Sequence, residues 1–114
     1  MTTNNLYTLA DRLLEQAREA RAGRASETVR GHGDRLRETV IALLAGQALN
    51  DHESPGEATL QVLRGEVRLT VPAGPDGTGG GEAALVAGDR TDIPPMRHGL
   101  SADTDAVVLL TVAL

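Results

Sequence analysis

The sequence has almost no aromatic residues: one tyrosine, and no phenylalanine or tryptophan, among 114 residues. A core must therefore consist of Leu, Val, Ile and Ala, and the chain offers no platform on which nucleic-acid bases stack. It also has no cysteine, which excludes disulfides and thiolate metal ligands. No apolar run approaches the length of a membrane span and no secretory leader is present, so we expect a cytoplasmic protein that does not contact a membrane.

Lysine is absent too, and arginine supplies every basic side chain. Seven of the eleven arginines lie within the first 37 residues, whereas the net charge of the whole chain is −5. The acidic remainder would repel phosphate backbones, so we expect no nucleic-acid partner. At this length the chain forms a single small core.

Residues 4–22 have the pattern of an amphipathic helix. Apolar residues recur at steps of three and four, with charged residues on the other face. Thr3, Asn4 and Asn5 offer N-cap side chains, and Gly23 is a plausible terminator. The apolar stripe has two interpretations: it packs on the outside of the same domain, or it forms a dimer contact.

The rest of the chain favours β-structure. Residues 25–30 and 36–45 are ambiguous by periodicity, but the β-branched run Thr39-Val40-Ile41 favours a strand. From residue 58 apolar and polar residues alternate, with a turn at Arg64-Gly65, and we expect strands near 82–86, 91–93 and 106–113. The Gly-rich run 72–81 predicts a flexible hairpin tip.

Two stretches, residues 46–65 and 87–98, resemble the two signature motifs of the cupin family. The motif residues retained here are Gly46, His52, Gly65, Gly88, Pro94 and His98. The resemblance implies a mainly β fold, a cupin-type antiparallel β-barrel (jelly roll), preceded by the N-terminal α-helix. We therefore divide the chain into a helix and arm (1–24) and a barrel domain (25–114).

In cupins, two His and a Glu of the first motif join the His of the second around a divalent metal. The chain keeps His52 and His98, but Ser54 stands where the second His is usual and Ala58 where the Glu is usual. Glu57 lies one residue earlier, and an offset of one residue turns a strand side chain to the opposite face. Glu57 reaches inward only if the chain bends before it. The ligand set that the resemblance implies for Zn, Ni, Mn or Fe is His52, His98 and Glu57.

Two imidazoles alone do not make a tight metal site. The alternatives are a loosely held metal and two cavity-lining His side chains without one. The expected pocket further includes Ser54, Leu60, Val62, Met96 and Arg97. Arg97 would hold an anionic ligand at the barrel mouth, or else form a surface ion pair.

Three functions remain open on this basis. The first is a barrel that binds a small molecule, a weakly held divalent metal, or both, without an assignable reaction. The alternative is a metal-dependent cupin enzyme of dioxygenase, isomerase or decarboxylase type acting on a small organic acid, so enzymatic activity stays uncertain. The third is an interaction module. A homodimer is expected in each case, because an uncovered edge strand needs a partner.

Overall fold

The computed structural model describes residues 1–31, 33–52 and 56–114, with Asp51 and His52 described by their backbone alone. This part of the chain contains one helix followed by nine strands. They are α1 (Leu6–Glu19), β1 (Arg24–Arg30), β2 (Leu36–Leu43), β3 (Ala48–His52), β4 (Glu57–Arg64), β5 (Glu66–Val71), β6 (Gly81–Val86), β7 (Arg90–Asp92), β8 (His98–Ala102) and β9 (Ala106–Ala113).

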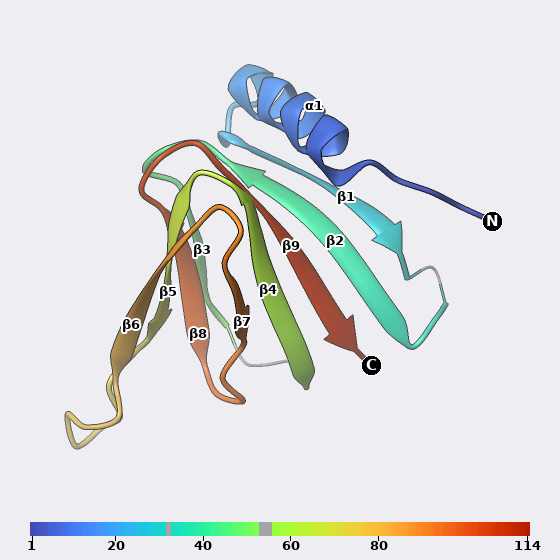
Figure 1. Ribbon diagram of the computed structural model, residues 1–114. Helices are drawn as coiled ribbons and strands as arrows, with labels where there is room; N and C mark the ends of the chain where they lie inside the picture. Colours follow the sequence, from blue (N-terminus) through green and yellow to red (C-terminus); the bar gives the residue numbers. More distant parts are fainter. Residues whose placement is uncertain (32, 53–55) are drawn as a thin grey trace.

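The strands form two antiparallel sheets that face each other (Figure 1). The five-stranded sheet has the order β1-β2-β9-β4-β7, and the four-stranded sheet has the order β3-β8-β5-β6. Each sheet joins strands from both halves of the chain, which is the pattern expected of a jelly roll. The predicted fold class, a mainly β sandwich or barrel with an N-terminal helix, is confirmed.

Helix α1 packs on the outer face of the five-stranded sheet. Its N-cap is Asn5, whose Oδ1 accepts a hydrogen bond from Thr8 N at 3.0 Å. The helix ends at Glu19, earlier than predicted, and Gly23 lies in the turn that follows. Its buried residues join outward-facing sheet residues in one cluster: Leu9, Ala10, Leu13, Leu14, Ala17, Val40, Ala42, Leu63 and Val107. The apolar stripe is therefore used within the chain.

A second cluster fills the space between the sheets. Strand β2 shows how alternation separates the two cores: Val40 and Ala42 face the helix, while Ile41 and Leu43 face the other sheet. The inner cluster is aliphatic throughout and consists of Leu43, Leu60, Val62, Val67, Leu69, Ile93, Leu100, Ala102, Ala106 and Val108. As the composition predicts, no aromatic side chain takes part.

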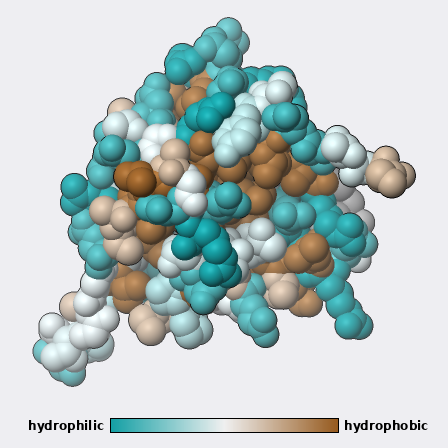
Figure 2. All heavy atoms as spheres, in the orientation of Figure 1, coloured by the Kyte–Doolittle hydropathy of each residue, from teal (hydrophilic) through white to brown (hydrophobic). Residues whose placement is uncertain are grey.

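The hairpins follow the predicted turns. Gly65 joins β4 to β5 with a φ of +76°, a conformation that L-residues with a Cβ rarely adopt. The loop between β5 and β6 projects from the body of the molecule, at the lower left of Figures 1 and 2. At its tip Asp76 Oδ1 accepts hydrogen bonds from Thr78 N and Thr78 Oγ1 at 3.0 and 2.8 Å.

The sequence pattern did not indicate β8, whose run His98–Ala102 is short and contains Gly99. The two neighbouring strands stabilise it instead: β8 lies between β3 and β5 and is buried along most of its length. Among the described residues, no helix is both long and apolar enough to cross a membrane.

Candidate functional site

The space between the sheets contains a small cavity at the level of His98. It has a volume of about 30 Å³, room for about one water molecule. Its described lining combines aliphatic side chains from both sheets with the imidazole of His98: Ile41, Leu49, Leu60, Leu69, Ile93, His98, Leu100, Val108 and Leu110. We call this cavity the lumen. It is an apolar environment with one polar group.

His98 begins β8, and its side chain is only 4% exposed. Within the described part of the chain, it is the only buried residue that is polar or charged. Its Nδ1 lies 2.9 Å from the carbonyl oxygen of Met96. Because a carbonyl only accepts, Nδ1 must donate, and in the neutral ring Nε2 is then the acceptor. The short loop before β8 thus fixes both the ring orientation and the tautomer.

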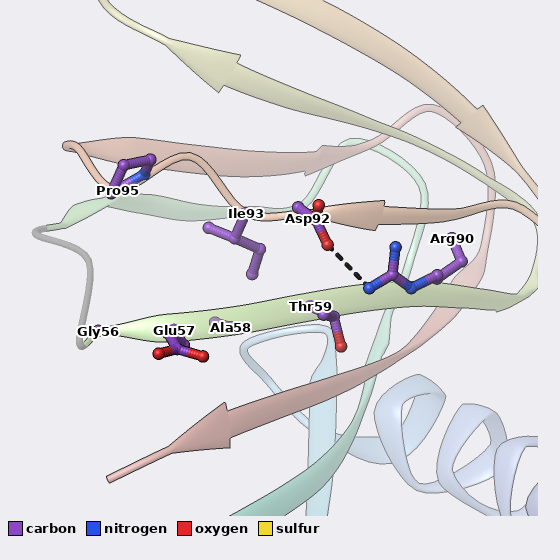
Figure 3. A pocket seen from close by; sticks show the side chains of 8 residues that line it. All are labelled: Gly56, Glu57, Ala58, Thr59, Arg90, Asp92, Ile93 and Pro95. Carbon is purple, nitrogen blue, oxygen red and sulfur yellow. Dashed lines mark hydrogen bonds and ion pairs between the residues drawn. The ribbon is translucent and has the colours of Figure 1, made fainter.

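A larger surface pocket, which we call the mouth, lies between the start of β4 and the segment after β7 (Figure 3). Its volume is about 730 Å³, and it is lined by Gly56, Glu57, Ala58, Thr59, Arg90, Asp92, Ile93 and Pro95. Arg90 Nη2 is paired with Asp92 Oδ1 at 2.8 Å. Ile93 is buried and lines both the mouth and the lumen. The mouth and the lumen therefore adjoin at Ile93.

Glu57 and Ala58 lie on opposite faces of β4. Ala58 packs against the inner cluster, at the position where the cupin motif has its Glu. Glu57 is exposed, and in Figure 3 its carboxylate points away from Ile93. The strand pleat explains the difference, since neighbouring residues alternate between faces. Glu57 therefore lines the mouth and not the described part of the lumen.

The other predicted site residues are dispersed. Leu60 lines the lumen and Val62 is fully buried in the inner cluster. The side chain of Met96 is 47% exposed, and Arg97 is also exposed, so neither lies in the lumen. Ser54 lies outside the described residues.

For His52, the backbone alone is described. The backbone of His52 on β3 lies directly opposite that of His98 on β8. This register brings the backbones of the two motifs side by side, as the family resemblance implies.

Several lumen residues were missed in the sequence, among them Ile41, Leu49 and Ile93. Ile41 lies in a continuous apolar run. Which face of the sheet its side chain occupies is therefore evident only from the pairing of β2 with β1 and β9. Ile93 had a usable signal, because it is the apolar residue directly before Pro94-Pro95 at the end of a strand. Arg90, in the charged lining of the mouth, was not indicated by the sequence.

The described residues do not fit a tightly held metal. No group of three or more metal-ligating side chains occurs among them. Among the described side chains, the lumen contributes one imidazole and otherwise aliphatic groups, whereas catalytic zinc sites usually have three protein ligands. Glu57 and Asp92 are exposed at the mouth.

Comparisons with known proteins agree with the fold. No protein-family model and no curated protein matches the sequence. Among solved structures, TT1209 from Thermus thermophilus is similar with a TM-score of 0.72 and 26% identity, covering 99% of this chain and 98% of that chain. An RmlC-like cupin from Desulfovibrio desulfuricans has a TM-score of 0.68 and 26% identity, covering 99% of this chain and 96% of that one. A conserved protein from Streptococcus pyogenes has a TM-score of 0.69 and 25% identity over 82% of this chain and 76% of its own.

The facing antiparallel sheets and these neighbours define the class of the protein: it has the cupin fold, and its structural neighbours are cupin and RmlC-like cupin superfamily proteins. More particularly, it is a small cupin-fold protein with an N-terminal helix and one aliphatic lumen.

Proposed function

We propose that the protein binds a small, largely aliphatic molecule in the lumen, with a polar group of that molecule hydrogen-bonded near His98. The observation that carries this proposal is the lining of the lumen, which, as far as its residues are described, is aliphatic except for one buried imidazole. Ligand sites are commonly apolar cavities with a few polar groups that fix orientation. A lining without aromatic rings favours an aliphatic ligand over a planar one that stacks.

The lumen of about 30 Å³ is smaller than such a ligand, so binding must enlarge it. Side chains at its border provide the means. Ile93 lies where it adjoins the mouth, and a change of rotamer there would join the two spaces. The ligand would then enter past the charged groups Glu57, Arg90 and Asp92, which remain in water. Burial of its apolar part supplies the affinity, at about 25 cal/mol per Å² removed from water.

The test uses 1-octanol as a neutral aliphatic probe, with binding followed by titration of backbone amide shifts. Leu110→Phe fills the lumen and should weaken binding by about tenfold or more, because the ligand loses its space. Leu109→Phe is the matched control, since Leu109 lies one residue away on the helix-facing side of β9. No saturable binding to the wild type, or equal weakening by both variants, contradicts the proposal.

A loosely held divalent metal is the second candidate, and the cross-strand register of His52 and His98 favours it. Because the described lining supplies only one imidazole, the affinity for the metal should be low, and a chelator should remove the metal. Metal analysis of protein purified without added metal tests this. One equivalent of tightly held Zn, Ni, Mn or Fe would support the enzyme alternative instead, and a metal content unchanged by His98→Ala would contradict a role for His98.

A further inference from the structure

A second surface pocket lies between strands β1 and β2 of the five-stranded sheet and strand β3 of the other sheet. It has a volume of about 300 Å³ and is lined by Arg24, Ala25, Ser26, Thr39, Ile41 and Leu49. We call it the side groove. It differs from the mouth, with which it shares no lining residue. None of the described residues in its lining is acidic.

The strand register explains how Arg24 reaches this groove. Arg24 lies directly opposite Leu43, and Ser26 lies directly opposite Ile41. Directly paired residues of antiparallel strands project to the same face. Since Leu43 and Ile41 face the inner core, Arg24 and Ser26 are on the inner face of β1. A cation and a hydroxyl group therefore stand at the edge of an apolar floor.

The side groove adjoins the lumen. Ile41 and Leu49 line both spaces, and each is only partly buried. Ile41 comes from one sheet and Leu49 from the other, so these two side chains close the gap between the sheets at this place. An extended molecule lying in the groove would have its apolar end against Ile41 and Leu49, at the border of the lumen.

Arg24 is the charged group of the groove. Within the described part of the chain it makes no ion pair, whereas Arg12 and Arg30 are paired with Glu27 and Asp34 at 3.1 and 3.7 Å. A guanidinium group presents several donors in a planar fork that matches a carboxylate. The apolar floor without aromatic groups selects an aliphatic partner for the same reason as in the lumen.

We propose that the side groove binds an aliphatic carboxylate, with the carboxylate on Arg24 and Ser26 and the hydrocarbon chain along Ile41 and Leu49 toward the lumen. This inference rests on the proposed function, because the apolar end of the ligand reaches the lumen. It adds the side groove as a second route to the lumen besides the mouth, and the carboxylate of an acid stays on Arg24 and Ser26 rather than near His98. It adds Arg24 as the residue that determines specificity for an acid over a neutral ligand.

The experiment compares octanoate with 1-octanol by calorimetry and by amide shifts, at one salt concentration. The wild type should bind octanoate about tenfold more tightly than 1-octanol, because one charge-assisted hydrogen-bonded pair is gained. Arg24→Gln should remove this preference and leave 1-octanol binding unchanged, and Arg24→Lys should restore part of it. Arg21→Gln is the matched control: Arg21 is also exposed and lies outside the groove, so the preference should persist.

The outcomes separate the two proposals. If 1-octanol binds but octanoate has no advantage, or if Arg24→Gln retains that advantage, the side-groove site is wrong while the lumen site stands. If neither probe binds the wild type, both are wrong. Light scattering of the wild type and of Ser26→Trp, which fills the groove, tests a second copy of the chain as the occupant. A dimer that becomes a monomer in Ser26→Trp would assign the groove to the predicted homodimer and overturn the acid-binding site.

Discussion

The imidazole of His98 is oriented by the carbonyl oxygen of Met96, which lies 2.9 Å from Nδ1. The two residues are separated by one position, so the bond closes a tight loop at the entrance to β8. Met96 N in turn donates to the carbonyl oxygen of Pro94 at 2.8 Å. The main chain of this proline-containing segment thereby sets which ring nitrogen faces the barrel interior.

The first prediction concerns the tautomer of His98. The neutral ring should carry its proton on Nδ1, because only a donor satisfies the Met96 carbonyl. Long-range nitrogen–proton correlation spectra of the imidazole distinguish the two tautomers directly. Observation of the Nε2-protonated form as the main neutral species would contradict the hydrogen bond on which the lumen site depends.

The second prediction concerns the turn at Gly65. A Cβ at Gly65 would lie 2.1 Å from the carbonyl oxygen of Asp105, and the φ of +76° is unfavourable for any other L-residue. Gly65→Ala should therefore lower the free energy of unfolding by about 3 kcal/mol, about 1 from the backbone conformation and the rest from the contact. Urea unfolding measures the change.

Gly46 provides the control for Gly65. Its φ is +84°, but a Cβ there would meet no atom within 4 Å. Gly46→Ala should lower the free energy of unfolding by only about 1 kcal/mol, the cost of the backbone conformation alone. Equal costs for the two substitutions would show that the approach of Asp105 is not what selects Gly65.

The third prediction concerns the contact between helix and sheet. Leu13 is 1% exposed in the cluster that joins α1 to β2, β4 and β9. Leu13→Ala should lower the free energy of unfolding by about 2 to 5 kcal/mol, because it leaves a cavity between the layers. Gln16→Ala on the exposed face of α1 should change it by less than about 0.5 kcal/mol. If Leu13→Ala melts the helix while the barrel keeps its unfolding midpoint, the two parts are separate units.

The fourth prediction concerns pH. The backbone N–H and then the hydroxyl of Thr78 donate to Asp76 and lower the pKa of its carboxyl. A carboxyl whose pKa is lower in the folded than in the unfolded protein stabilises the folded loop at any pH above its unfolded-state pKa, which is near 4. This stabilisation is lost as the pH falls through the folded-state pKa. Thr78→Val removes only the hydroxyl, so the pKa of Asp76 should rise part of the way. A carboxyl-carbon titration with unchanged values in Thr78→Val would contradict this account.

Local patterns were sufficient for much of the fold. The recurrence of Leu9 and Leu13 predicted the helix, and the alternation around Leu60 and Val67 predicted the hairpin through Gly65. These signals are local because side-chain direction repeats every 3.6 residues in a helix and every two in a strand. Strand β8 had no comparable signal, since its burial depends on β3 and β5, which pair with it from distant positions.

The sequence by itself determined an aliphatic core and the two motif stretches, in which Ser54 and Ala58 stand where the cupin motif has a His and a Glu. Only the tertiary structure decided that Glu57 faces outward, that mouth and lumen adjoin at Ile93, and that Arg24 shares a groove with Leu49. The physical reason is that the face a strand residue occupies follows from local alternation, whereas its neighbours across the sandwich follow from registers between strands far apart in the chain.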